Sequence, residues 1–97
     1  MTGYVLSRAA QADIEQIWDY TVRRWGEAQA GKYVLAIRDA CAGLAGGQYP
    51  SRAAEDIRAG YRQASVGSHI LFFRRPAGGG VAVVRVLHQR MDLLRHF

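Results

Sequence analysis

The chain has 97 residues, of which 49% are hydrophobic and 22% charged, and its formal net charge is +5. This length suffices for one domain, residues 1–97, with a single two-layer core, and it excludes a second lobe or a deep cavity for a small molecule. The composition excludes intrinsic disorder, and no apolar run is long enough to span a bilayer.

The chain opens with a predicted short strand, Tyr4–Leu6, and the residues before it contain no basic and apolar leader, so we expect a cytoplasmic protein. Ser7 then offers an N-cap hydroxyl for an amphipathic helix over residues 8–25. Its apolar stripe includes Trp18 and Trp25, which are predicted to anchor the core.

A second helix is predicted from Glu27 to the Gly46–Gly47 pair. Because Gly26 is the only break between the helices, they should form an antiparallel hairpin. Cys41 lies on the apolar stripe of the second helix and is expected to be a buried packing residue. Residues 48–60 lack periodicity and are predicted to be a surface loop, with room for a short helical turn.

Three strands are predicted in the second half, over residues 61–66, 69–75 and 81–90, and they should form an antiparallel meander. The tail, residues 92–97, is either one helical turn or extended. The overall expectation is an α+β fold: a strand, a helical hairpin and then the meander.

The third of these strands is the longest β-branched apolar run and should have strands on both sides. Strict alternation divides its side chains between two faces: Ala82, Val84, Val86 and His88 on one, and Val83, Arg85, Leu87 and Gln89 on the other. One face is expected to pack on the helices and the other to meet a partner. The alternative is a strand buried on both faces, with Arg85 at a frayed edge.

Positive charge is concentrated near the C-terminus, where residues 57–97 contain seven arginines and a single acidic residue, Asp92. Such a distribution favours an acidic partner, either nucleic acid, an acidic protein segment or both. No metal site is predicted, because His69, His88 and His96 lack ligand-like spacing. The arginines could stabilise a phosphate during RNA cleavage, or they are solvated or bind an acidic peptide.

Five strings in the same order cover almost the whole chain and resemble the ParE toxins of the RelE/ParE superfamily. They are residues 4–7 (YVLS), 17–20 (IWDY) leading into 24–26 (RWG), 57–62 (IRAGYR), 67–74 (GSHILFFR) and 84–92 (VRVLHQRMD). The resemblance implies a RelE-like two-layer fold and a toxin of a bacterial type II toxin–antitoxin module. Such a toxin inhibits DNA gyrase without a cofactor and is neutralised by a ParD-like antitoxin in a hetero-oligomer.

The RelE branch of the superfamily instead cleaves messenger RNA on the ribosome. This chain departs from that branch, because Lys32 is its only lysine and no tyrosine follows Tyr61. A non-enzymatic toxin that acts on gyrase or a related topoisomerase is therefore the main expectation, without catalytic residues. A ribosome-dependent endoribonuclease using Arg62, Arg90 and a histidine is the alternative.

Two sets of contact residues are predicted, without membrane binding or sequence-specific binding of nucleic acid. Contacts to the target are assigned to Arg62, Arg85, His88, Arg90 and Arg95. Contacts to the antitoxin, which is expected to cover the hairpin and the sheet edge, are assigned to Leu71, Phe73, Val83 and Leu87.

Overall fold

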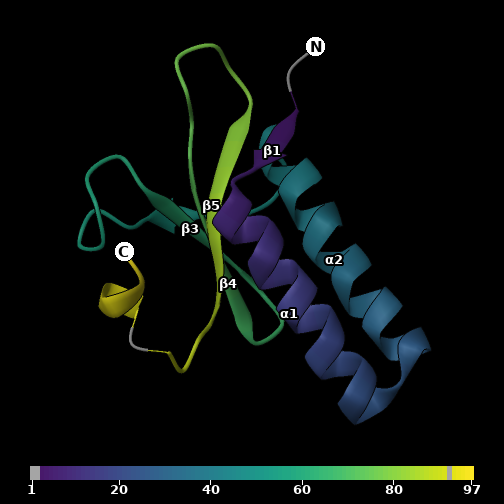
Figure 1. Cartoon of the computed structure of the whole chain (residues 1–97). Coiled ribbons are helices and arrows are strands. Elements are labelled where there is room, and N and C mark those ends of the chain that lie inside the picture. The colour runs from purple at the N-terminus through teal and green to yellow at the C-terminus, as the bar shows by residue number, and fades with distance from the viewer. Residues whose placement is uncertain (1–2, 92) are drawn as a thin grey trace.

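The computed structural model of the chain describes residues 3–91 and 93–97 (Figure 1). The elements follow in the order β1 (Tyr4–Leu6), α1 (Arg8–Trp25), α2 (Glu27–Ala45), β2 (Arg52–Ala53), β3 (Arg62–Val66), β4 (His69–Arg74), β5 (Val81–His88) and the 3-10 helix η1 (Leu93–His96). The predicted α+β fold is confirmed. Met1, Thr2 and Asp92 lie outside the described residues, so the prediction about a leader and the charge of Asp92 are not addressed by the structure.

The two helices form the predicted hairpin and have the predicted ends. The hydroxyl of Ser7 accepts the Ala10 N–H at 3.0 Å, which caps the first turn of α1. Gly26 ends α1, its N–H donating to the Val22 carbonyl at 2.9 Å, and its φ of +90° is a conformation that suits glycine. Figure 1 shows the helices side by side over the sheet. Neither helix is long and apolar enough to cross a bilayer.

The strands form one mixed sheet in the order β1-β5-β4-β3-β2. Strands β3, β4 and β5 make the predicted antiparallel meander, and β1 runs parallel to β5, which therefore has a strand on each side. Strand β2 pairs with the start of β3 within the segment predicted to be a loop, so the prediction was wrong there. A strand of two residues carries no periodic pattern from which it could be recognised.

Apolar side chains fill both faces of the sheet, in two separate clusters. The larger cluster lies between the sheet and the helices and contains Ile14, Ile37, Leu44, Leu71, Phe73, Val83 and Val86 among others. The smaller cluster lies on the opposite face and contains Ala54, Tyr61, Phe72 and Leu87, with Leu93 and Phe97 of the tail packed against them. Strand β5 is thus buried on both faces, as in the alternative left open by its sequence, but Arg85 is paired within the strand rather than lying at a frayed edge.

A β-bulge at Val84 breaks the alternation predicted for β5. Phe72 is opposite Arg85 but the next residue of β4, Phe73, is opposite Val83, so Val84 is the extra residue. Val83 therefore faces the helices while Val84 and Leu87 face the other way. The predicted faces were wrong because a single inserted residue exchanges them for the rest of the strand.

In the turn before β5, replacing Gly80 should cause the largest loss of folding stability. Its φ is +77°, and a Cβ there would lie 2.5 Å from the carbonyl oxygen of Gly3, which accepts the Val81 N–H. Gly80→Ala should therefore lower the free energy of unfolding by about 2–4 kcal/mol, from backbone strain plus the clash. Gly78→Ala is the matched control, because nothing lies within 4 Å of its Cβ. Urea unfolding that gave both variants equal stability would contradict this.

Candidate functional site

A groove of about 940 Å³ opens where the end of the helical hairpin meets the end of β5. Strand β1 pairs with β5 only as far as Val83, so no strand among the described residues covers the outer edge of β5 beyond it. Three large apolar side chains of the groove are open to solvent: Tyr20 at 55%, Trp25 at 66% and Met91 at 44% exposure. A concave surface of this kind is typical of a protein-binding site.

Two histidines from adjacent strands contact each other in the wall of the groove. His69 is opposite His88, and their ring centroids are 5.2 Å apart in an edge-to-face arrangement. The Nδ1 atom of His69 lies 2.6 Å from the hydroxyl of Tyr33 on α2, which also accepts the Ser68 N–H at 3.1 Å. Because Nδ1 of His88 accepts the Arg90 N–H, neutral His88 carries its proton on Nε2.

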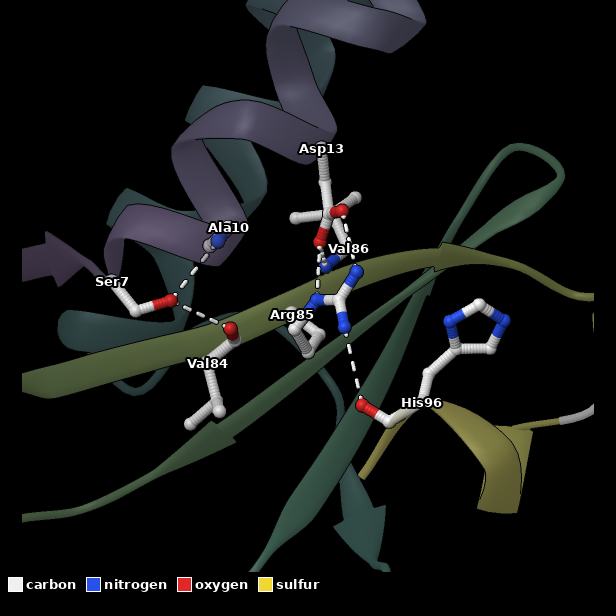
Figure 2. Close-up of polar contacts among 7 residues, drawn as sticks. All are labelled: Ser7, Ala10, Asp13, Val84, Arg85, Val86 and His96. Carbon is white, nitrogen blue, oxygen red and sulfur yellow. Dashed lines mark hydrogen bonds and ion pairs between the residues drawn. The ribbon is translucent and has the colours of Figure 1, made fainter.

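Asp13 on α1 substitutes for a strand along the uncovered edge of β5 (Figure 2). Its carboxylate accepts the Val86 backbone N–H at 2.9 Å and two bonds of 2.8 Å from the Nε and Nη2 atoms of Arg85. The carbonyl of Val84, the extra residue of the bulge, accepts a hydrogen bond from the Ser7 hydroxyl at 2.6 Å. Ser7, the N-cap of α1, and Asp13 within the helix thus satisfy polar groups of a strand edge that would otherwise lack partners.

Arg85 also connects α1 to the tail on the other side of the sheet. Its Nη1 donates to the His96 carbonyl at 3.1 Å, as Figure 2 shows. Next to it, the ring of Phe97 packs edge-to-face on Phe72 and Tyr61, at centroid distances of 5.0 and 5.7 Å. Of the two alternatives for the tail, the structure shows the helical turn, η1, and Leu93 and Phe97 pack there on the face of the sheet that the helices leave open.

The five residues predicted to bind the target are not brought together. Arg90 and Arg95 are exposed, and His88 lines the groove. Arg85 already forms an ion pair with Asp13 and a hydrogen bond with the His96 carbonyl of the tail. Arg62 lies at the opposite end of the sheet from His88, roughly 13 Å away along β3, because the partner of His88 is opposite Val66 rather than Arg62.

The four residues assigned to antitoxin contacts are buried inside the chain. Leu71, Phe73, Val83 and Leu87 are each at most 1% exposed. The first three pack beneath the helices and Leu87 lies under the tail. As a surface open to a partner this assignment was wrong, because it assumed that one face of the sheet is uncovered.

Sequence reasoning missed most of the groove. Trp18 and Trp25 were predicted to be core anchors, yet they are 38% and 66% exposed. Trp25 lies in the last turn of α1, where the groove rather than the sheet is beneath it.

Cys41 is buried as predicted, and burial raises the pKa of its thiol from 9.0 to about 11, so it is not a reactive thiolate at neutral pH.

Acidification should destabilise the chain through His69. Its pKa is lowered from 6.5, first by burial and then by the charge of His88, against an opposing effect of Asp13. Below pH 6.5 the unfolded chain then binds more protons, so the stability contributed by neutral His69 is complete above pH 6.5 and is lost as the pH falls through the folded pKa. Urea unfolding at pH 7.5 and 5.5 should show a smaller pH effect for His69→Gln than for the original chain; equal effects would contradict this.

Comparisons with known proteins identify relatives over nearly the full length. Residues 4–93 match the family model described as the ParE toxin of the type II toxin–antitoxin system parDE. Toxin ParE1 of Mycobacterium tuberculosis is 50% identical over 93 residues, which cover 96% of this chain and 95% of that protein. Toxin ParE1 of Caulobacter vibrioides is 40% identical over 96 residues, covering 99% and 98%. A solved structure described as a chromosomal ParDE TA system from P. aeruginosa superposes with a TM-score of 0.75 at 25% identity, covering 91% of this chain and 96% of that one.

Proposed function

Because the chain belongs to the ParE toxin family of type II toxin–antitoxin systems, we propose that it is a cytoplasmic toxin that inhibits DNA gyrase and so blocks replication. A ParD-like antitoxin neutralises it in a hetero-oligomer, in keeping with the ParDE description of the structural relative. The observation that carries this proposal is the 50% identity to a ParE toxin over 96% of the chain. The toxin works by binding its target rather than by making or breaking bonds.

The groove at the end of the hairpin is the proposed antitoxin site. Tyr20, Trp25 and Met91 offer exposed apolar anchors there, and aromatic and Met side chains are enriched in protein interfaces. The guanidinium of Arg24 lies 5.9 Å from the ring centroids of both Tyr20 and Trp25, so a cation borders the anchors. An antitoxin segment with apolar side chains and nearby carboxylates matches this surface in shape and charge.

The ribonuclease alternative finds less support in the geometry of the histidines. A metal-free cleavage needs an acid and a base on either side of a phosphate. His69 and His88 instead touch edge to face, which leaves no gap for a phosphate between them. Arg62, the cation assigned to that reaction, lies at the other end of β3.

Incubation of the purified chain with gyrase, ATP and plasmid tests the main proposal. We expect cleaved gyrase–DNA complexes to accumulate and supercoiling to fall. Mapping of messenger ends after induction in cells serves as the second measurement. Unaltered supercoiling together with new cuts inside codons would reject gyrase inhibition in favour of the ribonuclease.

A further inference from the structure

Strand β1 forms one edge of the sheet (Figure 1). The carbonyl of Gly3 accepts the Val81 N–H at 2.9 Å, so Gly3 directs its polar groups toward β5. Polar groups of successive strand residues point to opposite sides, so Val5 also bonds to β5, whereas those of Tyr4 and Leu6 point away from the sheet. In the part of the chain that the structure describes, these outward N–H and C=O groups have no hydrogen-bond partner.

The two edges of the sheet differ in how they are protected against pairing with another chain. Strand β2, at the opposite edge, has two residues, bears the exposed side chain of Arg52 and begins two positions after Pro50. Short strands, charged side chains and proline are the usual devices that block an edge. Strand β1 contains neither a charge nor a proline, and its central side chain, Val5, is 64% exposed. An extended segment can therefore add a strand along β1.

The two faces of β1 offer different chemistry to the side chains of an added strand. Tyr4 and Leu6 pack against the cluster beneath the helices, so Val5 points to the opposite face. On the helix side, the guanidinium of exposed Arg38 lies 6.0 Å from the ring centroid of Tyr4. Among the described residues, no carboxylate forms an ion pair with Arg38, including that of Asp39 next to it in α2. One set of alternate side chains would thus lie beside an apolar residue, and the other near a cation.

From this arrangement we infer that the outer edge of β1 binds an extended segment of a partner protein in which apolar and acidic residues alternate. The backbone of the segment pairs with Tyr4 and Leu6. Its apolar side chains lie beside Val5, and a carboxylate lies near Arg38. In this mode the backbone hydrogen bonds supply affinity and the alternate side chains supply specificity.

Charge distinguishes such a segment from a second copy of this chain. Each copy has a net charge of +5 and would bring the same exposed cations, Arg8 and Arg38, to a shared edge. Like charges oppose that pairing, whereas an acidic segment complements them. The inference depends neither on gyrase as the target nor on the groove as the antitoxin site.

NMR titration of the full ¹⁵N-labelled chain with a short blocked peptide of alternating valine and glutamate tests this inference. At neutral pH we expect a Kd of about 1 mM, as four backbone hydrogen bonds supply. The largest shifts should be those of the Tyr4 and Leu6 amides, which should also exchange more slowly with solvent. Absence of these shifts at about 10 mM peptide would overturn the inference.

N-methylation of alternate peptide nitrogens separates edge pairing from general attraction. Methyl groups on the nitrogens that face β1 remove donors and prevent close approach, whereas methyl groups on the other nitrogens leave the pairing side intact. One peptide, methylated either on its valines or on its glutamates, should therefore bind at least about 10-fold more weakly than the other. Equal affinities would show that the backbone of the peptide does not pair with the strand.

Two variants test the charge at this edge. Arg38→Gln should weaken binding of the peptide by about 2- to 5-fold, as expected for an exposed ion pair. Arg23→Gln, in the last turn of α1, changes the net charge equally and should leave the affinity unchanged. Equal weakening in both variants would overturn the inference. So would a dimer of the free chain, seen by analytical ultracentrifugation, that the peptide dissociates, because the edge would then pair with a second copy.

Discussion

Replacing Asp13 with alanine is expected to lower the free energy of unfolding by about 2–4 kcal/mol. The substitution removes three acceptor contacts and leaves the Arg85 guanidinium and the Val86 N–H without their partners at a largely buried position. Breaking a buried ion pair by removing one member costs about 3–5 kcal/mol, and we expect somewhat less because the Arg85 side chain is 21% exposed. Urea unfolding at neutral pH measures the loss.

Two further variants separate charge from hydrogen bonding at this position. Asp13→Asn keeps an oxygen that can accept the Val86 N–H and should lose less stability than Asp13→Ala. Asp19→Ala, on the exposed side of the same helix, should change stability by no more than about 0.5 kcal/mol. Equal stabilities of Asp13→Ala and Asp19→Ala would show that the ion pair does not hold the edge of β5.

The helices were predictable because their signals are local. The Ser7 hydroxyl caps the first turn of α1, and Gly26 ends it at a positive φ, so residues next to each other in sequence fixed these boundaries. The meander was predictable for the same reason, since β3 and β4 are joined by the tight turn at Gly67 and Ser68. The family strings added the RelE-like arrangement of these parts.

The functional surfaces were not predictable because they depend on contacts between distant segments. Leu87 looked like a partner contact on an alternating strand, but it is covered by Leu93 and Phe97 of the tail. Arg85 looked like a free cation, but it binds Asp13, which lies 72 residues earlier in the chain. A strict two-residue period cannot indicate either contact, nor the bulge at Val84 that decides which face each side chain occupies.

The exposure of Trp25 in the groove was not predictable from the sequence either. Trp25 falls on the apolar stripe of α1, and this spacing alone predicts a core residue. It is 66% exposed because the hairpin extends past the sheet there, and helical periodicity contains no information about where a sheet ends. An exposed tryptophan in a groove is a more informative observation than its position on the stripe.

Trp25→Ala is expected to weaken antitoxin binding by about 30- to 1,000-fold. Truncating a tryptophan at the centre of an interface costs about 2–4 kcal/mol, which is that range of affinity. The stability of the free toxin should change little, because most of the Trp25 side chain is open to solvent. Titration calorimetry with a ParD-like antitoxin that binds the original chain measures the affinity of each variant.

Leu35→Ala is the matched control for this prediction. Leu35 is 59% exposed, close to the 66% of Trp25, but it lies on α2 outside the groove. If the groove is the antitoxin site, the Leu35 variant should bind as tightly as the original chain. Equal weakening in both variants would mean that the antitoxin covers the hairpin broadly, and unchanged binding of Trp25→Ala would place its main contacts outside the groove.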